Sequence, residues 1–299
     1  MSAESPFAAL LREVPVAVDS VTVLGSVTKY WTYGPTDATE TVVFVHGYRG
    51  DHHGLEPVIA HLRGLRIIAP DLPGFGASEP LNRRHDIDGY AAWLGEFVTA
   101  LKLQHAPVLG HSFGSIIVSS AAAQRLITPP KLILVNPIAT LATSGPNVAL
   151  TKVAVLGYRA SARLPQAVGR WLIGSRGVVR VMSNIMTETP DKPRRAWIHG
   201  QHHAYFSVFA NMRSVVEGFE ASVTRSVGDV ASAIPMPTLL IGAELDPITS
   251  VAANHELEKQ IPDATLHLIP GVGHLIHYEK PREAAELLVR FLRAGHVTP

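Results

Sequence analysis

The 299-residue chain contains no cysteine, which excludes disulfide bonds and thiolate metal ligands. Charged residues are also scarce, at 17%, whereas hydrophobic residues make up 46%, a balance that indicates a large core and an apolar cleft. No stretch reaches about 18 uncharged apolar residues, so the sequence argues against a membrane span. The formal net charge is only +1, which gives no reason to expect a nucleic-acid partner.

The N-terminus lacks the basic cluster and the long apolar run of a secretory signal peptide, and it carries Glu4. We therefore expect a cytoplasmic location, although the missing cysteines by themselves leave the compartment open. A chain of this length accommodates one large α/β domain, or a core domain with an insertion.

Short apolar segments rich in β-branched residues alternate with helix-like segments along most of the chain. Most of the short segments are apolar throughout, as in parallel strands covered on both faces. Two earlier segments, 16–25 and 26–34, alternate more and predict an antiparallel opening pair. Residues 90–103 and 281–295 show the apolar spacing of helices. We predict an α/β fold with a doubly wound, mostly parallel sheet, whose other strands lie at residues 41–47, 65–71, 106–112, 131–137, 237–246 and 264–274.

The alternation of strand-like and helix-like segments stops after the sixth predicted strand. Residues 138–233 read as several helices separated by loops and prolines, and the strand pattern resumes at Pro237. We therefore predict a core formed by residues 1–137 and 234–299, with residues 138–233 inserted between them as a helical cap.

The predicted cap has a charge bias of its own, because no Asp or Glu occurs between Gly145 and Thr187. Three of its basic residues would share one helical face, and Pro165 is expected to end that helix. We interpret this surface as a solvated face of the cap. Contact with an anionic membrane surface or an acidic substrate is the alternative. The basic residues are Lys152, Arg159 and Arg163, which share the face, followed by Arg170, Arg176 and Arg180.

A single serine separates a predicted strand from a predicted helix in the sequence Gly110-His111-Ser112-Phe113-Gly114. Small residues two positions before and after Ser112 permit a sharp, strained turn that exposes the hydroxyl at the helix N-terminus. In open parallel sheets, ligands bind at the carboxyl ends of strands, where this serine lies. An ordinary small-residue contact between helix and strand is the alternative interpretation.

A serine hydroxyl is a weak nucleophile, so it needs a base that a carboxylate orients. Asp246 and His274 follow the last two predicted strands, and both fall at the same sheet edge as Ser112. Their order along the chain, serine, acid and then histidine, is the one that this architecture requires. Glu244 is an alternative acid.

The backbone N–H groups of Phe113 and Tyr48 are the expected donors to an oxyanion. Phe113 directly follows the serine, and Tyr48 lies in "FVHGYRG", the loop after an earlier strand. We expect His46 and Gly47 to shape that loop rather than to react.

These motifs resemble the α/β-hydrolase superfamily, in its capped, single-domain branch. The segments that carry the resemblance are "HGYRG", "DLPGFGAS", "GHSFGS", "GAELDPI" and "GVGHLIHYEKP". The resemblance implies the α/β-hydrolase fold and no metal or cofactor. Relatives that hydrolyse epoxides or carbon–halogen bonds use aspartate where this chain has Ser112, which argues against those reactions. Some relatives place the acid after the preceding strand, near the position of Asn136. Asn136 is not acidic, which favours Asp246 as the acid in this chain.

We also predict roles for residues outside these motifs. The stretch 202–218 is rich in aromatic residues and is expected to line an acyl or alcohol pocket, with plain cap core as the alternative. The resemblance gives Asp71 a structural role in a turn. The pairs His52-His53 and His202-His203 have no carboxylate at ligand spacing, so we interpret them as surface or cleft residues rather than metal ligands. The expected pocket residues are Tyr205, Phe206, Phe209 and Arg213, together with His111, which should point away from the serine.

The sequence therefore predicts a serine hydrolase that cleaves a small-molecule carboxylic ester with an apolar acyl or alcohol part. A carbon–carbon bond hydrolase, a lactonase, a thioesterase or a perhydrolase on the same residues stays open as an alternative. A glycine-rich "GGPG"-like loop is usual in the carbon–carbon hydrolases, and "HGYRGDHHG" departs from it. A non-catalytic receptor that binds a small ligand in the same fold is the alternative of a different class.

Overall fold

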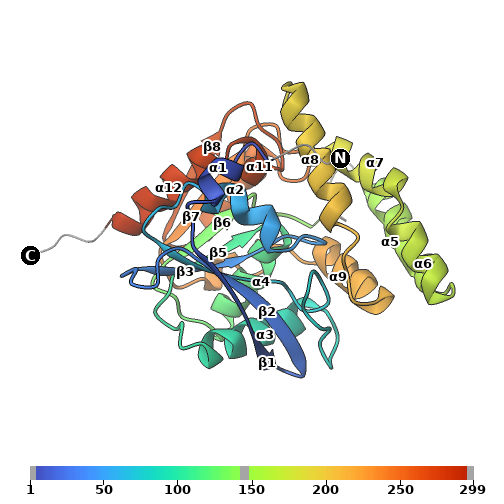
Figure 1. Ribbon diagram of the computed structural model, residues 1–299, viewed down its shortest axis with the longest axis horizontal. Helices are drawn as coiled ribbons and strands as arrows, with labels where there is room; N and C mark the ends of the chain where they lie inside the picture. Colours follow the sequence, from blue (N-terminus) through green and yellow to red (C-terminus); the bar gives the residue numbers. More distant parts are fainter. Residues whose placement is uncertain (1–4, 142–147, 295–299) are drawn as a thin grey trace, which may run out of the picture.

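The computed structural model describes residues 5–141 and 148–294. An eight-stranded sheet passes through its centre, with the strand order β1-β2-β4-β3-β5-β6-β7-β8 (Figure 1). β1 pairs antiparallel with β2 and β2 with β4, whereas all the other neighbours are parallel. The predicted opening pair and the mostly parallel sheet are confirmed. The strands are β1 Val16–Val23, β2 Ser26–Tyr33, β3 Thr41–Val45, β4 Arg66–Pro70, β5 Val108–His111, β6 Leu132–Val135, β7 Thr238–Ala243 and β8 Ala264–Ile269.

Helices cover both faces of the sheet, because the central strands carry apolar side chains on both sides. Val43 belongs to the cluster that contains Trp93 and Ile117 on one face, and its neighbour Val42 belongs to the cluster that contains Leu288 on the other. This alternation is the two-residue period of a strand. The helices of the core are α1 Ala8–Leu11, α2 Glu56–Ile59, α3 Ile87–Ala100, α4 Phe113–Ala123, α10 Val251–Gln260, α11 Ile276–Glu279 and α12 Pro281–Arg293, with the 3-10 helices η1 His52–Leu55 and η2 Ala231–Ala233.

The segment without a strand–helix rhythm forms helices between β6 and β7, as predicted. Pro165 caps the N-terminus of one of them and separates it from the helix before, because a proline cannot continue a helix. Figure 1 shows these helices along one side of the molecule, away from the C-terminus. The cap limits at residues 138 and 233 stay a prediction. The helices are α5 Val148–Ala162, α6 Gln166–Ile173, α7 Arg176–Met186, α8 Lys192–Tyr205 and α9 Met212–Thr224, and we refer to these five helices below as the cap.

No helix in the described part of the chain is both long and apolar enough to cross a membrane.

The turn from β5 into α4 depends on the two glycines that flank Ser112. Ser112 has φ 52° and ψ −117°, a conformation that costs a non-glycine residue strain energy. A Cβ atom on Gly110 would lie 2.5 Å from the Gly114 carbonyl oxygen, and one on Gly114 would lie 2.3 Å from the Val45 carbonyl oxygen. Both distances are far below van der Waals contact. The glycines therefore let α4 approach β3 and β5 closely enough to form the turn.

We expect Gly114→Ala to lower the free energy of unfolding by about 2–3 kcal/mol, because the added methyl group meets backbone that cannot rotate away. Urea denaturation measures this change. Gly157→Ala in α5 is the matched control, since a Cβ atom added there would have no neighbour within 4 Å. The control should leave stability unchanged or raise it by up to about 1 kcal/mol. Equal effects of the two substitutions would contradict the close-approach explanation.

Candidate active site

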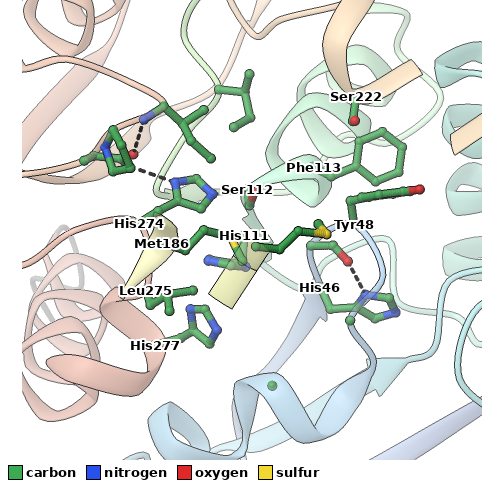
Figure 2. Close-up of a pocket in the computed structure, with 18 of the residues that line it drawn as sticks. His46, Tyr48, His111, Ser112, Phe113, Met186, Ser222, His274, Leu275 and His277 are labelled. Atoms are coloured by element: carbon green, nitrogen blue, oxygen red, sulfur yellow. Dashed lines mark hydrogen bonds and ion pairs between the residues drawn. The ribbon is translucent and has the colours of Figure 1, made fainter. Parts of the chain in front are cut away.

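The functional side chains predicted from the sequence meet at the carboxyl edge of the sheet. Ser112 directly follows β5, Asp246 lies shortly after β7, and His274 comes from the loop after β8. Neighbouring parallel strands end side by side, so residues distant in sequence become neighbours here. Figure 2 shows Ser112 with His274 on one side and Tyr48 and Phe113 on the other.

Ser112, His274 and Asp246 form a continuous hydrogen-bonded series. The Ser112 Oγ atom lies 2.8 Å from His274 Nε2, and His274 Nδ1 lies 2.9 Å from Asp246 Oδ2. His274 and Asp246 are both buried. The alternative acid, Glu244, instead accepts a hydrogen bond from the Gly271 amide at 3.1 Å. Asp246 is therefore the carboxylate that contacts this histidine.

Asp246 is held by donors besides His274. Its Oδ1 accepts a hydrogen bond from the Ile248 amide at 2.8 Å, and its Oδ2 accepts one from Asn136 Nδ2 at 3.0 Å. Burial alone raises the pKa of Asp246, but His274 and these hydrogen bonds outweigh burial and bring the pKa below its usual value. The carboxylate is thus ionised and fixed in one orientation toward His274 Nδ1.

Asn136 is a positioning residue whose role was not predicted from the sequence. It follows β6, is fully buried and has φ 46°, a left-handed conformation that asparagine tolerates well. Besides Asp246, its side-chain amide donates to the Gly273 carbonyl at 3.3 Å, and its oxygen accepts from the Ile276 amide at 3.4 Å. It therefore connects the acid to both sides of the histidine loop. A polar residue at a strand end was the available signal.

The turn after β3 brings Tyr48 next to the serine. A Cβ atom on Gly47 would lie only 3.3 Å from Ser112 Cβ, so the backbone of this turn borders the hydroxyl. Tyr48, Phe113 and Ser112 line the same cavity. Phe113 is the first residue of α4, so its N–H has no acceptor within the helix. Both residues predicted to donate to an oxyanion lie beside Ser112.

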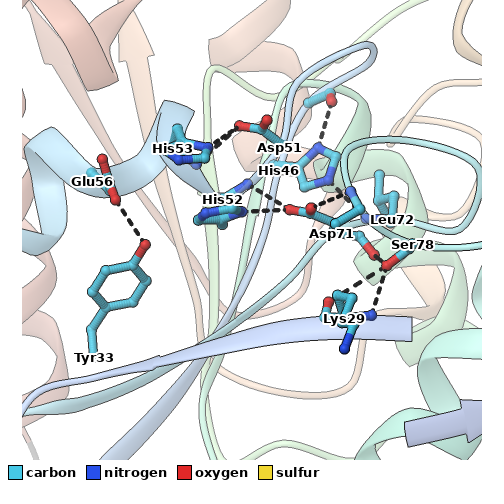
Figure 3. A network of polar contacts seen from close by, with 12 residues as sticks. Lys29, Tyr33, His46, Asp51, His52, His53, Glu56, Asp71, Leu72 and Ser78 are labelled. Carbon is cyan, nitrogen blue, oxygen red and sulfur yellow. Dashed lines mark hydrogen bonds and ion pairs between the residues drawn. The ribbon is translucent and has the colours of Figure 1, made fainter. Parts of the chain in front are cut away.

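A network of buried polar contacts lies next to this turn and holds its backbone (Figure 3). His46 contacts the Gly47 carbonyl through Nδ1 at 2.8 Å, and its Nε2 accepts from the Leu72 amide at 2.8 Å. Asp71 accepts from the amide of His52 at 2.9 Å and contacts its ring nitrogen Nδ1 at 2.8 Å. The expected turn-shaping role of His46 and the structural role of Asp71 agree with these contacts.

Arg49 links the same turn to the cap, which the sequence analysis did not predict. Its guanidinium is buried and donates to the Phe206 carbonyl at 2.7 Å, the Ile173 carbonyl at 3.2 Å and the Tyr158 hydroxyl at 3.2 Å. The two carbonyls lie at the C-terminal ends of α8 and α6, where the helix dipole favours a cation. Beside it, the Tyr48 hydroxyl donates to the Val215 carbonyl of α9 at 2.7 Å. The position of the turn is therefore tied to the position of the cap.

The site opens into a cavity of about 450 Å³ between the core and the cap. Its size lies within the usual range of small-molecule pockets. Around Ser112, the side chains of His111, Asp246 and His274 contribute polar atoms to the wall, and most of the wall formed by the cap helices is apolar. The apolar lining side chains from the cap are Met182, Ile185, Met186, Phe206, Phe219 and Val223.

Of the five pocket residues expected from the sequence, His111 and Phe206 line this cavity. The His111 ring packs 4.1 Å from the ring of His277, and burial lowers the pKa of His111 to about 3, so it is neutral. Both rings belong to the wall beside Ser112 in Figure 2. His277 and the lining residues from α7 were not predicted from the sequence.

The other three expected pocket residues lie elsewhere, which corrects the expectation. Tyr205 stacks on His53 at 4.2 Å instead of facing the cavity. Phe209 is buried beneath the guanidinium of Arg170, which lies 4.8 Å above its ring. Arg213 is exposed and pairs with Glu217 one helical turn later at 3.1 Å. The direction that each helix face takes after packing decides these positions, and composition alone does not reveal it.

Asp51, His52 and His53 are the cluster among the described residues that could approach a metal ion, with ligand atoms within 4.8 Å of one another. This differs from the prediction that these histidines have no carboxylate at ligand spacing. Asp51 contacts His53 Nδ1 at 3.2 Å, and Asp71 contacts His52 Nδ1 at 2.8 Å. These ring nitrogens are therefore already engaged. The pair His202-His203 also differs from the prediction of surface or cleft residues, because His202 is fully buried and its ring contacts the Ser183 hydroxyl.

Comparisons with known proteins agree with this architecture. A non-heme chloroperoxidase from Burkholderia pyrrocinia is 29% identical, covering 82% of this chain and 88% of that protein. An uncharacterized hydrolase of Bacillus subtilis, YugF, is 26% identical, covering 88% of this chain and 94% of that protein. An esterase from Exiguobacterium antarcticum shares the fold, with a TM-score of 0.77 and 17% identity over 93% of this chain and all of that one. A model of the alpha/beta hydrolase family matches residues 42–287, so the chain belongs to that family.

Proposed function

We propose that this protein is a serine hydrolase that cleaves carboxylic esters through an acyl-enzyme formed on Ser112. The observation that carries the proposal is the series Ser112–His274–Asp246, with contacts of 2.8 and 2.9 Å. A hydroxyl, an imidazole and a buried carboxylate in this order are the components of nucleophilic acyl transfer. The membership of a hydrolase family supports the same class of chemistry.

In the first step, Ser112 Oγ attacks the ester carbonyl carbon and His274 Nε2 accepts the hydroxyl proton. Asp246 accepts a hydrogen bond from Nδ1, which keeps Nε2 free of a proton before the attack and stabilises the imidazolium afterwards. The N–H groups of Tyr48 and Phe113 stabilise the negative charge that develops on the carbonyl oxygen. Such a donor typically contributes about 10²–10³ in rate.

In the later steps, His274 returns its proton to the leaving alkoxide, and the alcohol departs. Water then enters, His274 accepts one of its protons, and the hydroxide oxygen attacks the acyl carbon. Collapse of the second intermediate releases the carboxylic acid and restores the Ser112 hydroxyl. These steps use only the side chains and amides described above.

The side chains that line the cavity favour binding of an apolar substrate over a highly charged one. Apart from Ser222, its wall from the cap helices consists of methionine, isoleucine, valine and phenylalanine side chains, and the neighbouring His111 and His277 have pKa values lowered by burial. A medium-sized acyl or alcohol portion would exchange water for this apolar surface on binding. The neutral histidines leave the wall without a counter-charge for an anionic substrate.

We expect hydrolysis of a nitrophenyl ester series, from acetate to dodecanoate, to peak at one chain length. Ser112→Ala should lower turnover at that length by about 10³-fold or more, because the nucleophile is removed. Ser20→Ala on the exposed strand β1 is the control and should retain full activity. A labelling experiment with a fluorophosphonate probe distinguishes two failures. Labelling of Ser112 without ester turnover would move the assignment to a thioester, lactone or carbon–carbon substrate, and no labelling would favour a ligand-binding receptor.

We expect Asp246→Asn to lower turnover by about 10⁴-fold, because an amide at this position favours the wrong tautomer of His274. Glu244→Gln is the matched control two residues away, and it should change turnover by less than about threefold, since Glu244 contacts the Gly271 amide. Initial rates on the best nitrophenyl ester measure both. A loss below tenfold in Asp246→Asn, or equal losses in the two variants, would show that the acid has been misassigned.

A further inference from the structure

Exposed apolar side chains concentrate on three neighbouring cap helices. Fifteen large hydrophobic residues are exposed in the described part of the chain, and eight of them lie between Lys152 and Met186, on α5 to α7 and their connections. Trp171 is the most exposed, at 71%. We call these eight residues the α5–α7 face: Val153, Leu156, Leu164, Val168, Trp171, Leu172, Val181 and Ile185.

The helical periodicity shows that the exposed apolar residues are arranged and not scattered. On α5, Val153 and Leu156 lie one turn apart, with Lys152 and Arg159 on the strip directly beside them. On α7, Val181 and Ile185 are one turn apart, and Arg176 and Arg180 are likewise one turn apart. α5 therefore presents an apolar stripe next to a basic one, and on α7 the two arginines lie on the flank between the apolar stripe and the buried residues Val179 and Ser183. A solvated helix face would carry polar residues at the apolar positions.

The charge on this part of the cap is of one sign. The sequence from Gly145 to Thr187 has six Lys and Arg and no acidic residue, although the whole chain carries only +1. Two of the six are partly compensated, because Arg159 pairs with Glu220 of α9 and Arg170 donates to the Phe209 carbonyl. Within the described residues, Arg163, Arg176 and Arg180 form no ion pair with a carboxylate. Their charge is available to a partner.

We propose that the α5–α7 face docks on a membrane surface that contains anionic lipids. Basic residues beside exposed tryptophan and aliphatic side chains are the combination that binds at the boundary of headgroups and acyl chains. A second copy of this chain fits less well, because it would bring two surfaces of the same positive charge together. The docking itself does not depend on ester hydrolysis.

The position of α7 connects this surface to the cavity. Met182, Ile185 and Met186 of α7 line the cavity, and Ile185 is also half exposed on the α5–α7 face. Figure 1 shows α5, α6 and α7 together at the outer edge of the molecule. A docked protein would therefore hold one wall of its cavity at the lipid surface. If the proposed function is correct, this arrangement favours esters that partition into membranes.

Sedimentation of the full chain with vesicles tests the electrostatic part. Binding to phosphatidylcholine vesicles with about 30% phosphatidylglycerol should be at least about tenfold tighter than to pure phosphatidylcholine, and salt near 0.5 M should weaken it. Arg163→Glu/Arg180→Glu should weaken binding to the anionic vesicles by about tenfold or more. The control Lys102→Glu/Arg293→Glu reverses the same number of exposed charges at the ends of α3 and α12, away from the cap, and should change binding by less than about threefold.

Tryptophan emission tests the apolar part. Of the four tryptophans, Trp171 is the one exposed on the cap, so its emission should shift to shorter wavelength on anionic vesicles. Trp171→Phe should bind but lose the shift, and Trp171→Ser should bind more weakly. Val18→Ser, at another exposed apolar position, is the control and should bind normally. Circular dichroism verifies that each variant is folded.

Three results would overturn the proposal. The first is the absence of binding to anionic vesicles at low salt. The second is equal weakening by the cap and control charge reversals. The third comes from light scattering: a dimer that Trp171→Ser converts to a monomer would show that the face is covered by a second copy. Ester turnover in solution is measured separately, so loss of membrane binding with intact turnover rejects the docking and leaves the proposed function standing.

Discussion

The close approach of α4 to the strands β3 and β5 is the constraint on which the rest of the site depends. Hydrogen atoms in place of side chains at Gly110 and Gly114 permit it, since a Cβ atom at either position would meet backbone at 2.5 Å or less. The strain at Ser112 is then maintained by packing that cannot relax without separating these elements. Fixing this turn brings the Ser112 hydroxyl to the sheet edge where His274 and the Tyr48 turn also lie.

The sheet and the cap contribute differently to this site. The reacting groups follow the ends of parallel strands. Asn136 lies between the acid and the histidine loop and sets their mutual orientation through three hydrogen bonds. The cap forms the apolar walls of the cavity. It also contacts the turn that carries Tyr48, because the buried guanidinium of Arg49 donates to carbonyls of the cap helices. A displacement of the cap would therefore affect both the walls and the turn. The same helices present the outward face that we propose for membrane docking.

The sequence was most informative where local rules determine position. Ser112, Asp246 and His274 were identifiable because each residue stands at a strand end, and strand ends of a parallel sheet meet. Arg49 and His277 were not identifiable, because their roles depend on which distant segments pack against them. Tyr205, Phe209 and Arg213 were misplaced for the same reason: their helices turn those side chains away from the cavity. Pro165 was predicted correctly, since its effect on a helix is local.

Acid-quenched mass spectrometry of the protein mixed briefly with a nitrophenyl ester detects the proposed acyl-enzyme itself. We expect a mass increase equal to one acyl group, located by peptide mapping on Ser112 and absent in Ser112→Ala. The adduct should disappear as the carboxylic acid is released. Turnover with no adduct on Ser112, or with the acyl group on another residue, would contradict an acyl-enzyme at this serine.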